Sequence, residues 1–490
     1  MGLFRQPVKE TAMSFQEIET ILHPRSVAVV GASNNAFSFG FSYSHHMVEY
    51  GFKGPIYLVN PNHPEIMGLK TYPSVKAIPG TVDFAISCVN ASQVPAMLED
   101  LAEKSIKCVH LYTARFSETG RPEAAELEQT VLTLARSKGI RLIGPNCMGV
   151  YHPKIGLSFG FNLPKDSGPV GMISQTGGGA SGFVHLASLR GIRFSKVISY
   201  GNALDLTECD YLDYFIEDPG TKIILLYVEG VKDGRRFFDT LRRAAKVKPV
   251  IVMKGGRGQA GSRMTFSHTA SLAGSFPVWD AMIKQAGAVS VDDFDELIDL
   301  TVAFNFLPPV RGKRVGLIGG GGGPSVIAAE ECEGSGLEVI PIPQDMREEL
   351  KARGVTIWDW ISNPVDLSIV GGSGITDIDM LHLMAQHPAF DVLFANVNEW
   401  VIITLASDER FLTLKDIVKN YIILRDSYPK PFAVIFGERG VITKENDDWH
   451  WKVIAESRAE LIQAGMATFP TFRRAAIAIR KVQEYYARLV

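Results

Sequence analysis

Short runs of apolar residues recur along the chain, and several of them end at a glycine or an asparagine. Such runs predict buried parallel strands, because a strand covered on both faces is apolar throughout. Longer stretches with apolar residues at helical spacing lie between them, notably Val94 to Lys104 and Arg121 to Lys138. This alternation predicts doubly wound α/β sheets, which bind ligands at the carboxyl ends of their strands.

The chain of 490 residues is long enough for about three domains. We predict domains over residues 15–152, 167–307 and 311–490, with Leu307-Pro308-Pro309 as the last linker. The predicted strands are Ser26–Val30, Ile56–Asn60, Phe84–Val89, Cys108–Tyr112, Arg141–Gly144, Gly168–Ser174, Ile223–Val228, Val250–Met253, Val315–Ile318, Asp391–Ala395 and Pro431–Phe436.

Composition excludes several classes of protein. The net charge is −3 and no strongly basic block occurs, so we expect no nucleic-acid partner. Five cysteines without metal-ligand spacing fit a reducing compartment. The N-terminus lacks the apolar core of a signal peptide, and no uncharged apolar run reaches about 18 residues. We therefore expect a cytoplasmic protein without membrane contact.

The first predicted strand runs into the turn Gly31-Ala32-Ser33, and the next glycine is Gly40. This spacing is not Gly-x-Gly-x-x-Gly, and the second strand ends at Asn60-Pro61 rather than at an acidic residue, so NAD is disfavoured. A phosphate-bearing ligand is still expected, because a glycine turn before a helix offers free backbone N–H groups. The alternative is a glycine needed only for the turn.

Another candidate turn, Gly144-Pro145-Asn146-Cys147, follows the last strand of the first domain. It presents Asn146 and Cys147 at the carboxyl edge of the sheet. Cys147 either packs in the core, as most free cysteines do, or lines a site for a thiol or thioester.

In the second domain, Gln175-Thr176-Gly177-Gly178 opens a helix directly after a strand. Consecutive glycines at a helix start are entropically costly, and close approach to an anion explains them better than a flexible linker does. The strand ending before Glu229 and the strand leading to the His268 loop belong to the same sheet, so Glu229, His268 and this helix start can converge. A carboxylate would fix the tautomer of His268 and leave its other nitrogen free to attack. The alternative is a solvated loop histidine. A metal site is disfavoured, because no residue near His268 looks like a second metal ligand.

The third domain contains a further glycine run, Gly319 to Gly323, between a predicted strand and a helix from Ser325 to Glu333. Pro324 suits a first helical position. The run is a second candidate phosphate site at Gly320, Gly321, Gly322 and Gly323. A generic flavodoxin-like sheet with no site of its own is the alternative.

Taken together, the chain resembles the alpha subunit of the NDP-forming acyl-CoA synthetases, the ADP-forming acetyl-CoA synthetase branch of the succinyl-CoA synthetase superfamily. The motifs that carry the resemblance are Val29-Val30-Gly31-Ala32-Ser33, Val59-Asn60-Pro61, Gly144-Pro145-Asn146-Cys147, Ser174-Gln175-Thr176-Gly177-Gly178, Ser267-His268-Thr269 and Asn363-Pro364-Val365-Asp366.

The resemblance implies a Rossmann-like CoA-binding domain followed by two flavodoxin-like domains. It implies CoA contacts at Gly31, Ala32, Ser33, Gly40, Asn60, Pro61, Val89, Asn146 and Cys147. It also implies a phosphohistidine at His268, oriented by Glu229, with the Gly320–Gly323 helix facing it from the opposite side. In that family acyl-CoA and phosphate yield an acyl phosphate and CoA, and the phosphoryl group passes through histidine to a nucleoside diphosphate.

Two departures from the family pattern stand out. Ala270 and Ser271 follow Ser267-His268-Thr269 where relatives read glycine and alanine, and Arg115 occupies a turn where relatives often have glycine.

A grasp-type nucleotide domain does not follow within the sequence, and no Gly-x-x-x-x-Gly-Lys-Ser/Thr motif replaces it. We therefore expect a hetero-oligomer in which a grasp-type beta subunit supplies ADP or ATP with Mg²⁺, while this chain handles a small carboxylic acid, CoA and phosphate. The alternative is a CoA-binding or regulatory subunit without ligase chemistry.

Overall fold

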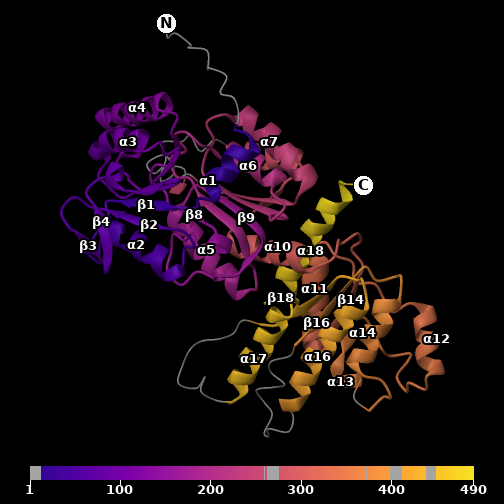
Figure 1. Cartoon of the computed structure of the whole chain (residues 1–490). Coiled ribbons are helices and arrows are strands. Elements are labelled where there is room, and N and C mark those ends of the chain that lie inside the picture. Colours follow the sequence, from indigo (N-terminus) through magenta and orange to yellow (C-terminus); the bar gives the residue numbers. More distant parts are fainter. Residues whose placement is uncertain are drawn as a thin grey trace. The chain divides into compact units, whose positions relative to one another are not determined.

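The computed structural model describes residues 13–258, 260–261, 275–370, 372–397, 411–437 and 449–489, with positions 411–413 described as backbone only. The chain forms two compact units (Figure 1). The first contains the described residues up to Ser188 and from Arg193 to Asp292, and the second contains Leu189–Ile192 and the described residues from Asp293 onward. This division does not test the three predicted domain ranges, which stay a prediction.

The first sheet has seven strands in the order β3-β4-β2-β1-β5-β6-β7. The pairs from β4 to β7 are parallel, whereas β3 and β4 form a short antiparallel edge that the sequence pattern did not predict. The five predicted strands are confirmed. The strands are β1 Val27–Val30, β2 Ile56–Val59, β3 Glu65–Ile66, β4 Leu69–Tyr72, β5 Phe84–Ser87, β6 Cys108–Leu111 and β7 Arg141–Ile143.

Helices α2, α3 and α4 flank this sheet, whereas α1 packs against the helix Glu208–Glu217 (α6), where Phe15 stacks on Tyr214. The Ser38 hydroxyl accepts a hydrogen bond from the Phe41 N–H at 3.1 Å and so caps α2, which ends at Gly51 in the left-handed region. Leu98 and Leu101 of α3 are fully buried against strand residues such as Val109. The helices are α1 Phe15–Leu22, α2 Phe39–Tyr50, α3 Val94–Glu103 and α4 Pro122–Ser137, with 3-10 turns η1 Val75–Ala77, η2 Ala91–Gln93 and η3 Ser117–Thr119.

The second sheet has six strands in the order β13-β12-β11-β9-β10-β8. All neighbours are parallel except β8, which pairs antiparallel with β10 although it lies inside the predicted first domain. The parallel part has the flavodoxin-like order and confirms that expectation. Its strands are β8 Gly149–Tyr151, β9 Ser167–Ser174, β10 Phe194–Ser199, β11 Ile223–Val228, β12 Val250–Lys254 and β13 Val289–Val291, and its helical elements are η4 Pro153–Ile155, α5 Gly177–Leu189, α6 Glu208–Glu217, α7 Gly234–Val247 and α9 Phe276–Gln285.

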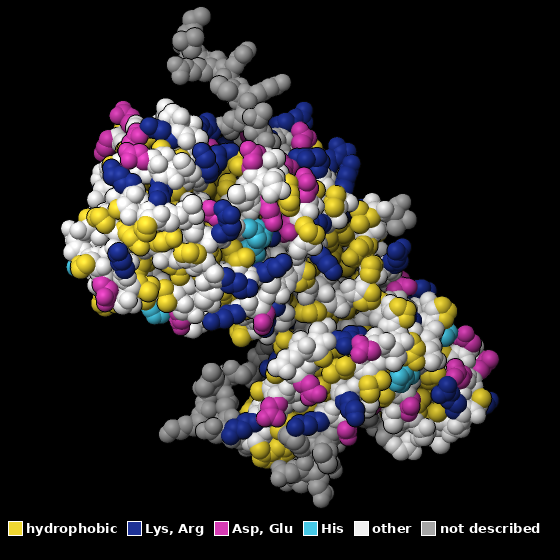
Figure 2. All heavy atoms as spheres, viewed as in Figure 1, with side chains coloured by type: hydrophobic (Ala, Val, Ile, Leu, Met, Phe, Trp, Pro, Cys, Tyr) yellow, Lys and Arg dark blue, Asp and Glu magenta, His cyan; other side chains and the backbone are white. Residues whose placement is uncertain are grey.

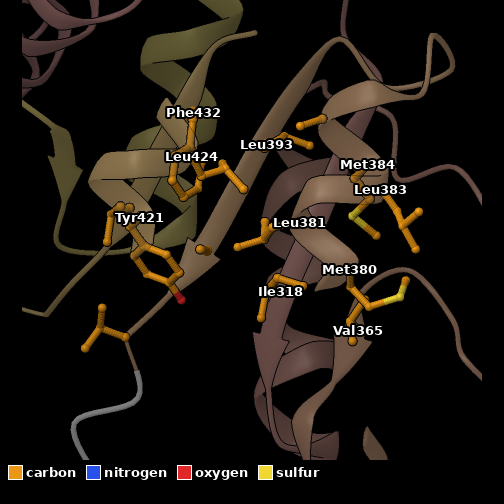
Figure 3. Packing of buried hydrophobic residues seen from close by; sticks show 14 of the residues in the cluster. Ile318, Val365, Met380, Leu381, Leu383, Met384, Leu393, Tyr421, Leu424 and Phe432 are labelled. Carbon is orange, nitrogen blue, oxygen red and sulfur yellow. The ribbon is translucent and has the colours of Figure 1, made fainter. Parts of the chain in front are cut away.

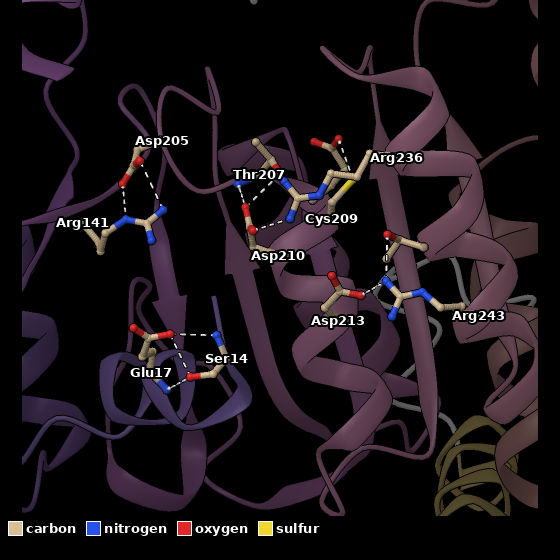
Figure 4. A network of polar contacts seen from close by, with 12 residues as sticks. Ser14, Glu17, Arg141, Asp205, Thr207, Cys209, Asp210, Asp213, Arg236 and Arg243 are labelled. Carbon is tan, nitrogen blue, oxygen red and sulfur yellow. Dashed lines mark hydrogen bonds and ion pairs between the residues drawn. The ribbon is translucent and has the colours of Figure 1, made fainter. Parts of the chain in front are cut away.

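A polar network joins the first sheet to the segment before α6 (Figure 4). The Asp205 carboxylate, almost fully buried, accepts hydrogen bonds from Arg141 Nε at 2.7 Å and from the Leu142 N–H at 3.0 Å. Further along, Asp210 closes a capping box at Thr207 and pairs with Arg236 at 2.6 Å. These bonds satisfy buried carboxylates that would otherwise be costly.

The second unit contains a five-stranded parallel sheet in the flavodoxin-like order β15-β14-β16-β17-β18. Its core packs Ile318, Leu393, Met384 and Tyr421 between the sheet and its helices (Figure 3). The elements are α10 Phe294–Phe306, β14 Val315–Gly320, α11 Gly322–Gly334, α12 Gln344–Ala352, β15 Val365–Asp366, α13 Leu367–Val370, α14 Asp377–Gln386, β16 Val392–Asn396, α16 Phe411–Ser427, β17 Phe432–Ile435, α17 Trp449–Gln463, β18 Ala467–Phe469 and α18 Phe472–Ala487.

The surface is mixed in charge. On the face drawn in Figure 2, basic and acidic side chains are interspersed among apolar ones, as a net charge of −3 leads one to expect. Among the described residues, none of the helices is both long and apolar enough to cross a bilayer.

Candidate functional site

A cleft opens at the carboxyl edge of the first sheet, around the ends of β1 and β5. These neighbouring strands mark the point where the strand order reverses, which is where doubly wound sheets bind ligands. The larger part of the cleft has a volume of about 830 Å³ and the smaller part about 400 Å³. Both parts are lined by Gly31, Cys88, Val89 and Asn90, so they lie on either side of the same strand ends.

The glycine turn after β1 is shaped by close backbone contacts. Gly31 has φ +88°, and a β-carbon there would lie 3.0 Å from the Cys88 carbonyl carbon. A β-carbon on Gly40 would lie only 1.9 Å from the Gly31 carbonyl oxygen. Both positions therefore need glycine, and the first turn of α2 can approach the cleft closely.

The other predicted CoA residues of this region divide into two groups. Val89 lines both parts of the cleft and Pro61 lines the smaller one, whereas Ala32 is buried. Asn60 donates from its side chain to the Ala32 carbonyl at 2.7 Å and so holds the turn. Ser33 accepts a hydrogen bond from the Asn35 N–H within the same loop. Asn60, Ala32 and Ser33 thus shape the cleft without lining it.

Asn146 and Cys147 lie beside the cleft rather than in its lining. Cys147 is 4% exposed, and burial raises the pKa of its thiol to about 12. This geometry favours the packing interpretation of Cys147 over a reactive thiol. Asn146, in the left-handed region at φ 58°, donates its backbone N–H to the Thr113 carbonyl and its side chain to Asn202 at 3.4 Å. A CoA contact of either residue stays a prediction.

A second candidate site lies where α5 begins, between the ends of β9 and β11. The Gln175 side-chain oxygen accepts hydrogen bonds from the backbone N–H groups of Glu229, at 2.5 Å, and Gly230, at 3.1 Å. The start of α5 and Glu229 are therefore adjacent, as the sequence predicted. Because β9 and β11 flank the reversal point of the second sheet, this is also its expected ligand edge.

The glycines at the start of α5 leave space for a ligand. A β-carbon on Gly177 would lie 2.6 Å from the Met148 side chain, so a larger residue does not fit there. Gly178 is exposed and has open space around it. The Thr176 hydroxyl accepts the Gly179 N–H at 3.3 Å, which satisfies one of the free amides of the first turn.

Glu229 is buried among groups that restrict its position. Its carboxylate accepts a hydrogen bond from the Tyr227 hydroxyl at 3.3 Å, and its carbonyl accepts one from Lys254 Nζ at 2.7 Å. Burial lowers the pKa of Lys254 to about 8, against the opposing effect of Glu229. Burial and the Glu229 carboxylate both raise the pKa of Tyr227. The carboxylate is thus held at the edge of the sheet where β12 ends.

His268 lies outside the described residues, which stop at Gly261 and resume at Ser275. The pairing of His268 with Glu229 therefore stays a prediction.

The third glycine run joins β14 to α11. Gly320 has φ +105°, and a β-carbon on Gly319 would lie 2.4 Å from the Ser325 hydroxyl. Gly321 and Gly323 have open space around them, and a β-carbon on Gly322 would meet only the Asp366 carboxylate, at 3.1 Å. The helix begins at Gly322, earlier than the predicted Ser325, and phosphate binding at Gly320–Gly323 stays a prediction.

Sequence reasoning missed three residues that line the larger cleft, namely Ser38, Tyr112 and Arg121. Phe39 and Arg115, which the sequence had already singled out, line it as well. Ser38 carried a detectable signal, because a serine directly before the first helical residue, here Phe39, is a good N-cap. The side chain of Tyr112 follows β6 directly, at the carboxyl edge where ligand contacts are expected.

The chain is similar to known proteins in two regions and over most of its length. Residues 25–153 match a family described as a CoA binding domain, and residues 167–304 match a succinyl-CoA ligase like flavodoxin domain. The chain is 37% identical over 378 residues to the alpha subunit of acetate–CoA ligase (ADP-forming) II of Pyrococcus furiosus, a match that covers 77% of this chain and 82% of the relative. It is 39% identical to the alpha subunit of acetate–CoA ligase (ADP-forming) I of the same organism, over 72% of this chain and 76% of the relative.

A solved structure is similar as well. It is the dinucleotide forming acetyl-coenzyme A synthetase 1 of Ca. Korarchaeum cryptofilum in complex with phosphate and ADP, with a TM-score of 0.78 and 29% identity. The match covers 96% of this chain and 97% of that one.

Proposed function

The chain belongs to the alpha-subunit family of the ADP-forming acyl-CoA ligases, and from this premise we propose that it interconverts acyl-CoA, phosphate and ADP with carboxylic acid, CoA and ATP through a phosphohistidine at His268. The observation that carries the proposal is the pair of hydrogen bonds from the N–H groups of Glu229 and Gly230 to Gln175. They support the proposal because they bring the backbone of Glu229 next to the residues that precede α5, at one edge of the sheet.

The first step joins phosphate to the acyl group. A phosphate oxygen attacks the thioester carbonyl carbon, the carbon–sulfur bond breaks, and CoA leaves as the thiol after taking up a proton. Backbone N–H groups at the start of α5, at Gly177 and Gly178, stabilise the phosphoryl group, because free amides and the helix dipole favour an anion there. CoA occupies the cleft beside β1 and β5, whose lining includes Gly31, Gly40 and Val89.

In the second step a ring nitrogen of His268 attacks the phosphorus, and the bond from phosphorus to the acyl oxygen breaks. The carboxylate of the acid leaves. Glu229 accepts the N–H of the other ring nitrogen, which selects the tautomer that can attack. An oxygen of the ADP β-phosphate then attacks the phosphorus and releases His268. This transfer needs positioning and charge neutralisation more than covalent help.

We further propose that a grasp-type beta subunit supplies ADP together with Mg²⁺, in a cytoplasmic hetero-oligomer. The subunit naming of the relatives supports a partner chain. The five cysteines are all free thiols, which supports a reducing compartment. The helix start at Gly320–Gly323 is proposed as an additional phosphate-binding element, supported by its open glycines.

The test is labelling of the full chain, together with its partner subunit, by acyl-CoA and radioactive phosphate. We expect an acid-labile, base-stable phosphoprotein, the stability profile of a phosphohistidine. His268→Ala should abolish the label and Glu229→Gln should slow its appearance, whereas His63→Ala, at an exposed histidine, should label as the parent does. Undiminished labelling of His268→Ala would refute the site. A chain that binds CoA and never labels would be the non-catalytic subunit instead.

A further inference from the structure

A buried histidine without a hydrogen-bond partner lies on α2. His46 is 5% exposed, and among the described residues neither of its ring nitrogens has a hydrogen-bond partner. Burial lowers the pKa of His46 to about 4, and the adjacent His45 adds to this effect. The ring is therefore neutral near pH 7 and offers one N–H donor and one nitrogen acceptor. Buried polar groups are costly when unpaired, so this position calls for a ligand or a bound water.

The surroundings of His46 are aromatic. The ring of Phe161 meets the His46 ring almost at right angles, with 3.9 Å between the centroids, and the centroid of the Tyr43 ring lies 6.0 Å away. The Tyr43 hydroxyl is already occupied, because it donates to the Met148 carbonyl at 2.8 Å. Of these three side chains, His46 is therefore the one with hydrogen-bonding atoms to offer. Phe161 is 43% exposed, so its ring has room to turn outward and admit a ligand.

This aromatic site adjoins the region between the CoA cleft and the start of α5. Tyr43 packs on Tyr112, with 5.3 Å between the ring centroids, and Tyr112 lines the larger part of the cleft. On the other side, Met148 lies against the start of α5, since a β-carbon on Gly177 would approach its side chain to 2.6 Å. His46 follows Tyr43 by one turn of α2. The proposed chemistry requires the thioester to lie between the cleft and α5, so its acyl group can extend to His46.

We propose that His46 binds a hydroxyl group on the acyl part of the substrate, so that the substrate class of this chain is hydroxylated carboxylic acids. The proposal rests on the proposed function, since it requires an acyl-CoA substrate. A hydroxyl can accept from the imidazole N–H or donate to the other ring nitrogen, whereas a second carboxylate needs a charged partner. Phe161 and Tyr43 supply apolar contact to the carbon chain or ring that carries the hydroxyl.

The experiment is calorimetric titration of the full chain with pairs of acyl-CoA thioesters that differ by one terminal hydroxyl. The pairs are propionyl-CoA with 3-hydroxypropionyl-CoA, and 3-phenylpropionyl-CoA with 3-(4-hydroxyphenyl)propionyl-CoA. In the parent, the hydroxylated member of at least one pair should bind roughly 5- to 50-fold more tightly. His46→Phe should reduce this preference to within about 2-fold and leave the affinity for CoA itself within about 2-fold of the parent. His46→Gln should keep part of the preference, because an amide still donates and accepts.

His45→Phe is the matched control. Nδ1 of His45 lies 3.1 Å from a Glu49 carboxylate oxygen, so this variant should keep the hydroxyl preference of the parent. The thermal midpoint of His46→Phe should equal or exceed that of the parent, since the change removes an unpaired buried group.

Two results would overturn the proposal: a parent without preference in either pair, and a preference that survives in His46→Phe. A lower midpoint of His46→Phe, combined with no preference in the parent, would mean that His46 holds a structural water only. A parent that binds neither CoA nor any of the thioesters would overturn the CoA function itself.

Discussion

Gln175 offers a test of how the phosphate edge of the second sheet is held together. In Gln175→Leu the shape of the side chain is nearly kept, but the oxygen that accepts the N–H groups of Glu229 and Gly230 is lost. Gln175 is only 3% exposed, so water does not easily replace that acceptor. A buried donor left without a partner costs about 1–3 kcal/mol, and two such donors cost about 2–6 kcal/mol before any relaxation.

The assay combines urea unfolding with hydrogen exchange of individual amides. The unfolding midpoint should fall, and the amides of Glu229 and Gly230 should exchange faster than in the parent, since their hydrogen-bond acceptor is gone. Thr176→Val is the matched control, because the Thr176 hydroxyl accepts one N–H at 3.3 Å and its loss should cost only about 0.5–1.5 kcal/mol. If Gln175→Leu keeps the parental midpoint and the Gly230 amide stays slow, the side-chain oxygen does not hold this edge.

Three further predictions concern other parts of the first unit. Gly40→Ala places a β-carbon 1.9 Å from the Gly31 carbonyl oxygen, so it should lower the free energy of unfolding by about 1–3 kcal/mol. It should also weaken CoA binding in a calorimetric titration of the full chain, and an unchanged stability and affinity would contradict the close contact. Burial lowers the pKa of Lys254 to about 8 from an ordinary 10.5, so between these values the unfolded chain binds the proton more tightly than the folded one does, and stability should rise with pH across that window. Urea midpoints measured across the window should lose part of that rise in Lys254→Met, and a parallel curve for the variant would refute the assignment. Asp205→Asn weakens the ion pair with Arg141 and should lower the stability in thermal unfolding by about 1–3 kcal/mol. This loss is smaller than for a fully buried pair, because Arg141 is partly exposed. An unchanged thermal midpoint would count against a stabilising role of the pair.

The sheets were predictable because their strands are buried on both faces. An apolar run such as Val27–Val30 has few other structures open to it once a glycine turn follows. Several of the strands that escaped prediction are short. β3 and β4 form an edge hairpin of Glu65–Ile66 and Leu69–Tyr72, and two or four residues at an edge carry no periodic signal. The α11 start was placed too late, because glycines are poor helix formers and Gly322 carries no start signal.

The adjacency of candidate residues was predictable where it follows from the strand order. Gln175, Glu229 and the glycines of α5 lie near one another because strand ends of one sheet share an edge. The structure adds that Asn60 shapes the cleft without lining it, which depends on a side-chain direction that spacing cannot supply. Arg115 was noticed only as an odd residue in a turn. The structure adds that its φ of 78° lies in the left-handed region and that its N–H donates to the Glu118 carboxylate, and neither can be deduced from residue spacing.

The antiparallel pairing of β8 with β10 limits how this protein can be divided. A cut after residue 152 would remove β8, Gly149–Tyr151, from its partner and leave Val197–Ser199 of β10 as an unpaired edge strand on the remaining fragment. Unpaired edge strands of that kind pair with other chains and lead to aggregation. A separately produced fragment of the first sheet should therefore end before Gly149, so that β8 stays with β10.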